Sequence, residues 1–304
     1  MTLEQLRIFV AVAEREHVTQ AARDLNLTQS ATSSAIGVLE ARYQTKLFDR
    51  VGRGIILTSA GHIFLAEAKA VLARAEAAEH VLADLAGLRR GTIHVAASQT
   101  VGNYWLPRYL HDFKATYPGI SISLTIGNTT EVAALVRDGA ANIGFVEGEV
   151  TDPRILVAPI ATDELLLVAA PGHPWVGKAL ETRDFGSTPW VVRETGSGTR
   201  DIVSALFESS GLAADDIDAS LVLPSNEAVR SAVEAGSGVT VLSRLVVEKA
   251  VQAGSLVVID HPVPDRHFFM LRHKDFHETV AVQGFIKMFD NHFDASAGVD
   301  HRSR

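Results

Sequence analysis

A run of small polar side chains in residues 28–34 has the chemistry needed to contact DNA bases. Gln29 would lie in the first turn of a helix, where its amide can pair with adenine, and Thr28 is the expected N-cap. At helical spacing the outward stripe consists of Ser30, Ser33, Ser34 and Gly37. Small uncharged side chains let a helix approach a surface closely, and the DNA major groove admits one helix. The pattern therefore predicts a base-reading surface.

Two arginines in the following stretch have the chemistry for phosphate contacts. Residues 47–61, LFDRVGRGIILTSAG, predict a short hairpin with Gly52-Arg53-Gly54 at its tip. A hairpin beside the reading helix would place Arg50 and Arg53 for phosphate or minor-groove contact. Cations act locally here, so a nearly neutral segment can still supply these contacts.

Two hydroxyl-rich loops further along have the chemistry of an anion site. The first, residues 97–102, contains Ser98, Gln99 and Thr100, and the second, residues 194–200, contains Thr195, Ser197 and Thr199. Each follows a predicted strand and opens a predicted helix, where free N–H groups and hydroxyls can hold an oxyanion or carboxylate. For either loop alone, simple helix capping is the alternative.

Further polar residues are predicted on the same side of the sheets. Helix starts there carry Thr129, Thr130, Ser225 and Asn226, which are weaker candidates for ligand contacts. Glu147 ends a predicted strand, and the sequence leaves open whether it meets an amine or balances Arg200.

Several other chemistries find no support in the sequence. The chain has no cysteine, which excludes disulfides, thiolate metal sites and cysteine nucleophiles. Gly196-Ser197-Gly198 does not match the G-x-S-x-G motif of a nucleophile elbow. His273 and His277 are spaced i, i+4 but have no third ligand in view. We therefore expect no enzymatic activity, cofactor or metal.

The reading surface requires two short helices around a tight turn. The second helix would bury Thr32, Ala35, Ile36 and Leu39. The first would bury Val18, Ala21, Ala22 and Leu25, with Thr19 as a possible cap and Asn26-Leu27-Thr28 as the turn. A plain helical hairpin without DNA-binding function would show the same core pattern.

Residues 59–88 contain a heptad pattern. Phe64, Val71, Ala78 and Leu85 recur every seven residues, as do Ala68, Ala75 and Leu82. This alanine-rich a/d seam is typical of two closely paired helices. The alternative is a single helix packed on its own domain.

After Gly91 the pattern changes to strands alternating with helices. Helices are predicted at residues 103–116, 129–138 and from about 199 and 226, with apolar strands between them. The alternation occurs in two cycles, which predicts parallel α/β sheets in two subdomains. Ligands bind such sheets outside the carboxyl ends of the strands, where the two hydroxyl-rich loops are expected.

The charge is distributed unevenly over the 304 residues, whose net charge is −8. Residues 1–58 carry seven basic and six acidic side chains and residues 59–90 four of each, which leaves −9 on the remainder. The acidity therefore belongs to a different part of the chain from the predicted DNA reader. Acidic residues at the N-terminus and the lack of a long apolar run predict a soluble, cytoplasmic protein without membrane contact.

Residues 1–61 resemble the winged helix-turn-helix of the LysR-type transcriptional regulators. The similarity rests on LRIFVAVAE, TQAARDLNLTQSATSSAIGVLE, LFDR and R-G-x-x-L-T-x-A-G in this order, and it continues to about residue 290. Many members have Pro, Arg and Gln near positions where this chain has Ser30, Ser34 and Ala35. We therefore expect base preferences specific to this helix.

The resemblance implies an all-α winged helix-turn-helix over 1–58, a linker helix over 59–90 and an α/β effector domain of two Rossmann-like subdomains over 91–304. Subdomain I would cover about 91–161 and 267–304 and subdomain II about 162–266, with crossing strands near 161–168 and 266–272. The family implies promoter DNA as partner, a homodimer through the linker helix and further assembly to a homotetramer. By analogy with the cysteine-biosynthesis members, the effector would be a sulfate-like oxyanion, with a small carboxylate as second choice. A solute-binding or enzymatic α/β protein with an N-terminal dimerisation module is the alternative.

Overall fold

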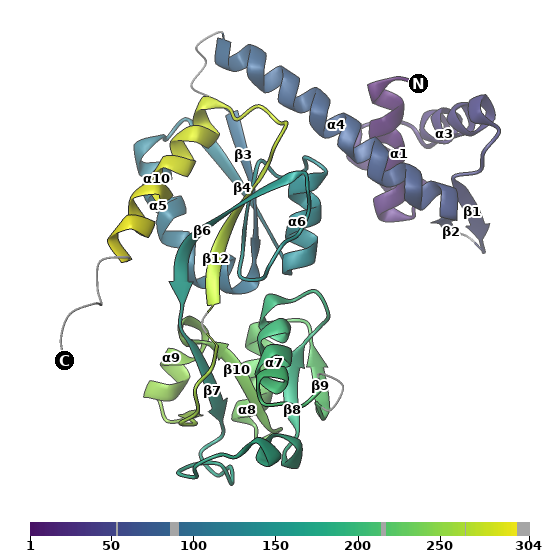
Figure 1. Ribbon diagram of the computed structural model, residues 1–304. Helices are drawn as coiled ribbons and strands as arrows, with labels where there is room; N and C mark the ends of the chain where they lie inside the picture. The colour runs from purple at the N-terminus through teal and green to yellow at the C-terminus, as the bar shows by residue number, and fades with distance from the viewer. Residues whose placement is uncertain (53, 86–90, 214–216, 265, 297–304) are drawn as a thin grey trace. The chain divides into compact units, whose positions relative to one another are not determined.

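The computed structural model describes the chain except residues 53, 86–90, 214–216, 265 and 297–304 (Figure 1). The described residues divide into two compact units. One contains a helix-turn-helix, a two-stranded hairpin and a long helix, and the other contains two five-stranded sheets with their helices. In the described part of the chain, no helix combines the length and hydrophobicity needed to cross a membrane.

The N-terminal unit is a winged helix-turn-helix followed by a long helix. Its elements are α1 (Leu3–Arg15), α2 (Val18–Asp24), α3 (Gln29–Tyr43), β1 (Phe48–Val51), β2 (Gly54–Leu57) and α4 (Ser59–Leu85). Thr2, His17 and Thr28 cap the first three helices by accepting bonds from backbone N–H groups. The cap predicted at Thr19 is wrong, because α2 already begins at Val18 and the His17 ring nitrogen takes that role.

Phe9 is the centre of this unit's core. Its ring is fully buried and lies 5.5 Å from the Phe48 ring and 4.8 Å from the Phe64 ring. These contacts join α1 to the wing and to α4, since each ring comes from a different element. Truncating such a buried ring typically costs about 3–5 kcal/mol. Thr32, Ile36 and Leu39 of α3 are buried as predicted.

The second unit contains two mixed sheets. The first has the order β4-β3-β5-β12-β6 and the second β11-β7-β10-β8-β9. The first sheet's strands are β3 (Gly91–Ser98), β4 (Ile120–Gly127), β5 (Ile143–Val146), β6 (Ile155–Asp163) and β12 (Arg266–His273). The second sheet's strands are β7 (Leu165–Ala169), β8 (Trp190–Arg193), β9 (Ala219–Leu223), β10 (Val239–Ser243) and β11 (Val257–Val258).

Helical segments follow most of these strands. The first subdomain, built on the first sheet, has η1 (Val101–Trp105), α5 (Pro107–Thr116), α6 (Thr129–Arg137) and α10 (Val280–Ser296). The second has η2 (Thr182–Ser187), α7 (Gly198–Ser209), α8 (Asn226–Glu234) and α9 (Arg244–Gln252). The single helix predicted over 103–116 is interrupted at Pro107, since proline has no N–H to continue the preceding turn.

The alternating pattern had predicted parallel sheets, but each sheet also contains antiparallel strand pairs. β3 pairs in parallel with β4 and β5, but β12 runs antiparallel to both β5 and β6. The reason is that the chain leaves the first sheet through β6 and returns through β12, in the opposite direction. One residue, Glu164, separates β6 from β7 of the second sheet, so the outward crossing falls inside the predicted range. β12 belongs wholly to the first sheet.

Candidate functional site

The outward face of α3, called the reading face here, consists of small polar residues. Gln29, Ser30, Ser33, Ser34 and Gly37 are all exposed. The Thr28 hydroxyl accepts from Ala31 N at 3.2 Å and lies 3.1 Å from the Ser30 hydroxyl. Thr28 therefore fixes the start of the helix, whereas Gln29, Ser33 and Ser34 are exposed, as the predicted base contacts would require.

Glu40 connects α3 to the wing, and the sequence patterns did not single it out. Its carboxylate accepts from Lys46 Nζ at 2.8 Å, Leu47 N at 2.8 Å and Phe48 N at 3.3 Å. Burial raises the pKa of this carboxyl, but these three bonds and the Lys46 charge outweigh it, so the pKa is lowered. The ionised Glu40 thus holds the first wing strand against the reading helix. The sequence does contain a signal that could have identified Glu40, namely a glutamate near the end of a predicted helix with a lysine six residues later.

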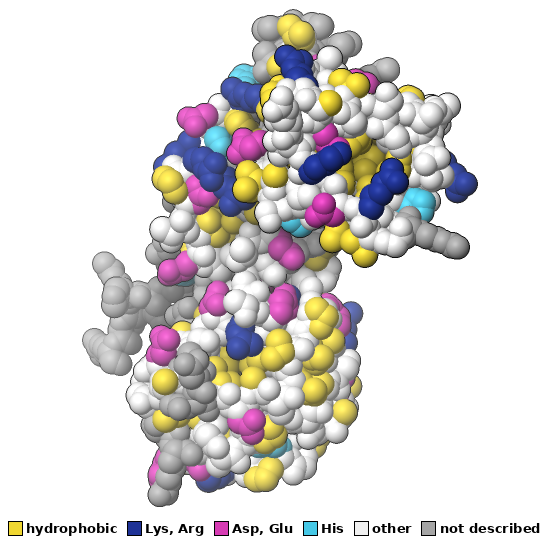
Figure 2. Space-filling view, turned by 90° about the vertical axis from the view of Figure 1, so that its right-hand side faces the viewer, with side chains coloured by type: hydrophobic (Ala, Val, Ile, Leu, Met, Phe, Trp, Pro, Cys, Tyr) yellow, Lys and Arg dark blue, Asp and Glu magenta, His cyan; other side chains and the backbone are white. Residues whose placement is uncertain are grey.

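The wing is a regular two-stranded hairpin. Phe48 pairs with Leu57 and Arg50 with Ile55 in antiparallel register. Arg50 is exposed on β1, as phosphate contact requires, and Arg53 lies outside the described residues. On the face shown in Figure 2, Lys and Arg side chains are visible at several places, with Asp and Glu side chains among them.

The heptad seam of α4 divides into two halves. Ala68 is buried in the core of the N-terminal unit and Phe64 packs against it, as expected for a helix folded onto its own domain. Further along, Val71 is 43% exposed, Leu82 is 68% exposed and Ala78 is exposed. The side chain of Leu85 lies outside the described residues. The alternative of packing on its own domain therefore holds for the first half, and the second half presents apolar side chains outward.

Three predicted residues lie side by side at the carboxyl edge of the first sheet. Ser98 ends β3 opposite Gly127 of β4, Thr129 follows β4, and Glu147 follows β5. All three are at most 5% exposed. Among the described residues, Ser98 Oγ, Thr129 Oγ1 and Glu147 Oε2 are buried atoms without a hydrogen-bond partner. We call these the three unpartnered atoms. Buried polar atoms normally have hydrogen-bond partners, so these three differ from most buried polar groups.

Thr129 is free because its neighbour caps the helix. Asn128 Oδ1 accepts from Glu131 N at 3.0 Å, and the Asn128 backbone N donates to Glu131 Oε2 at 2.9 Å. Capping is thus completed without the Thr129 hydroxyl, and η1 likewise has no side-chain cap at Thr100. The capping alternative is therefore wrong for Thr100.

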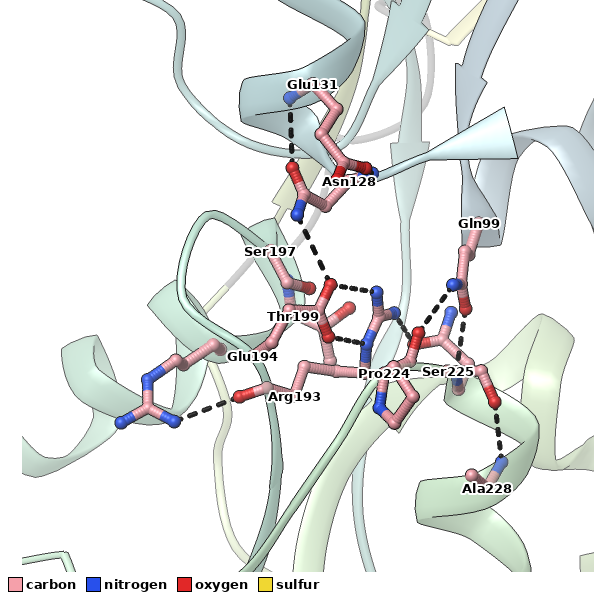
Figure 3. A network of polar contacts seen from close by, with 12 residues as sticks. Gln99, Asn128, Glu131, Arg193, Glu194, Ser197, Thr199, Pro224, Ser225 and Ala228 are labelled. Atoms are coloured by element: carbon pink, nitrogen blue, oxygen red, sulfur yellow. Dashed lines mark hydrogen bonds and ion pairs between the residues drawn. The ribbon is translucent and has the colours of Figure 1, made fainter. Parts of the chain in front are cut away.

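Asn226 joins the first loop to the second subdomain. Its backbone N donates to Gln99 Oε1 at 3.0 Å, its Nδ2 donates to Thr100 Oγ1 at 2.9 Å, and its Oδ1 accepts from Arg193 at 2.7 Å. Gln99 also donates to the Pro224 carbonyl at 2.8 Å, and Figure 3 shows this side chain reaching the start of α8. Gln99 and Asn226 therefore hold the two subdomains together.

The Thr100 hydroxyl has a fixed direction in this network. Because it accepts from Asn226 Nδ2, its own hydrogen points to Glu147 Oε1, 3.2 Å away. The expectation that Thr100 donates to an effector is thus not supported by its contacts. Thr100 instead orients the Glu147 carboxyl, one of whose oxygens remains unpartnered.

The second loop contributes mainly structure. Ser197 Oγ caps α7 by accepting from Thr199 N at 3.3 Å, so capping is the correct interpretation for Ser197. Thr199 Oγ1 accepts from Arg266 Nη1 at 3.1 Å, and Thr195 is exposed. A Cβ at Gly198 would lie 2.8 Å from Gly148 Cα, so only glycine allows the subdomains to approach this closely.

Two buried arginines lie at the same place, and each is balanced by a carboxylate. Arg193 donates to both oxygens of Glu194 at 2.8 Å (Figure 3), and Arg266 pairs with Asp163. Arg200 instead donates to the Arg193 carbonyl at 2.9 Å, so it does not balance Glu147. Burial raises the pKa of the Glu147 carboxyl, although Arg266 opposes this.

Within the part of the chain that the structure describes, no group of three or more His, Cys, Asp or Glu side chains is placed to hold a metal ion. His273 ends β12 and its ring stacks on Phe276 at 3.9 Å.

Comparisons with known proteins decide the family. Residues 3–62 match the family model described as "Bacterial regulatory helix-turn-helix protein, lysR family", and residues 86–294 match "LysR substrate binding domain". The chain belongs to the LysR family of transcriptional regulators. It is 34% identical over 292 residues to the uncharacterized HTH-type transcriptional regulator YeiE of Escherichia coli K12, covering 95% of this chain and 97% of YeiE.

Solved structures show the same fold as this LysR-family regulator. Full-length CbnR, crystallised with its target DNA, has a TM-score of 0.68 at 23% identity, covering 95% of this chain and 99% of CbnR. The CcmR regulatory domain of Synechocystis PCC6803, in complex with 2-PG, has a TM-score of 0.60 at 25% identity, covering 66% of this chain and 99% of that domain. Family membership makes this protein a regulator with DNA-binding and effector-binding domains. The alternative of an enzyme or solute-binding protein is therefore wrong.

Proposed function

We propose that this regulator binds promoter DNA as a homo-oligomer and responds to a small anion held at the carboxyl edge of the first sheet. The observation that carries the effector proposal is the set of three unpartnered atoms, from Ser98, Thr129 and Glu147. Leaving buried polar groups without partners costs about 1–3 kcal/mol each. A ligand that supplies these partners is therefore favoured.

An anion suits the surroundings of these atoms. Ser98 and Thr129 can each donate a hydroxyl hydrogen, and the first turns of α6 and α7 add positive helix ends. The charges of the nearby Arg193 and Arg266 are balanced by Glu194 and Asp163. The ligand would therefore be held by hydroxyls and helix ends, and not by an unpaired guanidinium group. The CcmR domain, which binds 2-PG, supports a small ligand in a domain of this fold. A sulfate-like oxyanion is our first choice and a small carboxylate the second.

Removing the free hydroxyls should weaken effector binding. We expect Ser98→Ala and Thr129→Val each to raise the Kd of the best-binding anion about tenfold or more, since a hydrogen bond to a charged group contributes about 1.5–3 kcal/mol. Calorimetry with sulfate, thiosulfate and short carboxylates would measure this. The matched control is Thr195→Val, because the Thr195 hydroxyl is exposed in the other loop. Equal affinities of all four proteins would rule out this effector site.

The reading face and the wing should contribute differently to DNA binding. We expect Gln29→Ala to relax preference at one base pair, at a cost of about 1–3 kcal/mol on the best site. Arg50→Ala should instead weaken all sequences about equally and reduce the slope of log K against log salt by about 1. Titrations of operator and unrelated DNA at several salt concentrations separate the two effects. If both variants change the sequence preference and the salt dependence of DNA binding in the same way, the assigned roles are wrong.

A further inference from the structure

Glu147 is a buried carboxyl with one oxygen engaged and one oxygen without a partner. Its side chain is 3% exposed at the end of β5, and Oε1 accepts from the Thr100 hydroxyl at 3.2 Å. Oε2 is buried and has no partner among the described residues. A carboxylate placed among anion-binding hydroxyls would repel the ligand it is meant to help hold. A proton must therefore lie between Oε2 and any anion bound there.

The charges facing Glu147 do not remove this requirement. Arg266, on β12, and Arg193, on β8, stabilise its ionised form, whereas Asp163, on β6, opposes ionisation. Both arginines already donate to other carboxylates, namely Asp163 and Glu194. Burial is the largest influence and raises the pKa of Glu147 above its ordinary value. Protonation of this carboxyl is thus easier than for an exposed glutamate.

We propose that Glu147 selects, among small anions, those that carry a hydrogen on one oxygen. This inference rests on the anion site proposed above and specifies which anions it takes. The ligand O–H donates to Glu147 Oε2, and its charged oxygens accept from the Ser98 and Thr129 hydroxyls. Nothing is transferred, since the proton stays on the ligand throughout.

A fully ionised anion must obtain that proton elsewhere. Sulfate binds only when Glu147 itself is protonated, so that the carboxylic acid donates to a sulfate oxygen. Above the pKa of Glu147 its affinity falls about tenfold per pH unit, because one proton is taken up with each ligand. Monohydrogen phosphate has the same shape and charge as sulfate but brings its own hydrogen. Its affinity therefore holds over the same range.

Calorimetric titration of the full-length protein with sodium sulfate and sodium phosphate, from about pH 8 to about pH 9.5, where phosphate is almost wholly the monohydrogen form, tests this proposal. In the wild type we expect the ratio of sulfate Kd to phosphate Kd to rise steeply with pH, approaching tenfold per unit. In Glu147→Gln we expect a ratio independent of pH and tighter sulfate binding at high pH, because the amide donates without titrating. The matched control is Glu149→Gln, an exposed carboxylate two residues on, which should behave as wild type.

The possible outcomes separate this inference from the proposal beneath it. One outcome is that both anions bind and Ser98→Ala weakens the binding of both, which supports the anion site. If the ratio of sulfate Kd to phosphate Kd then changes with pH in the same way in wild type and Glu147→Gln, the proposed role of Glu147 is wrong. If neither anion binds the wild type, the anion site itself is wrong and this inference falls with it. Operator binding by Glu147→Gln without effector, at wild-type affinity, shows that the variant is folded.

Discussion

Replacing Asp163 with alanine should destabilise the effector domain by about 3–5 kcal/mol, because it leaves the charge of Arg266 buried without its partner. The side chains of Arg266 and Asp163 are only 2% and 1% exposed, and two bonds join them. Asp163 also accepts from the Ser243 hydroxyl at 2.6 Å, a bond that would be lost too. Since domains are stable by about 5–15 kcal/mol in total, this is a large loss.

The adjacent residue provides a matched control for that experiment. Glu164 pairs with Arg244 at 2.5 Å, but both side chains are about half exposed, so Glu164→Ala should change stability little. The double variant Asp163→Leu, Arg266→Met should recover most of the stability, since it removes both charges together. Urea denaturation followed by far-UV circular dichroism measures all three. A similar small effect of Asp163→Ala and Glu164→Ala would show that the buried pair is dispensable.

The helix-turn-helix was predictable from sequence because its signals are local. Thr32, Ile36 and Leu39 recur at the spacing of one helix face, and Thr28 is a capping residue directly before them. No long-range information is needed to place such a helix. Glu40 was missed for the opposite reason: its partners lie in the loop after the helix and at the start of β1, and only the fold brings Lys46, Leu47 and Phe48 to its carboxylate.

The edge of the first sheet was predictable, but the hydrogen-bond directions within it were not. Ser98 and Glu147 were each assigned to the end of a predicted strand, and parallel strands end at one edge of a sheet. The direction of the Thr100 hydroxyl depends on Asn226, which is 126 residues away in sequence. Likewise, Arg266 and Asp163 meet across a separation of 103 residues. Sequence spacing gives no measure of such contacts, so which hydroxyls are free could be seen only in the fold.

Replacing Leu82 with aspartate should abolish tight binding to an operator with two half-sites. We propose that the exposed half of the α4 seam pairs with a second copy, because Val71 and Leu82 are large apolar side chains that are 43% and 68% exposed. A carboxylate in that contact would lose its hydration without gaining a partner. Two linked reading heads bind far more tightly than one, commonly by about 10²–10⁴-fold. Loss of pairing should therefore cost at least about 100-fold in operator affinity.

The matched control is Ile63→Asp, the same kind of change on the same helix. Ile63 is 73% exposed but lies off the heptad seam, so its replacement should leave the dimer intact. Sedimentation of the full-length protein reports pairing, and titration with a single half-site reports each reading head separately. Leu82→Asp should keep its affinity for the half-site, because the substitution is far along α4 from the reading face of α3. If the Leu82→Asp protein sediments like the wild type and binds the operator with two half-sites as tightly as the wild type does, the exposed half of the seam does not pair two copies.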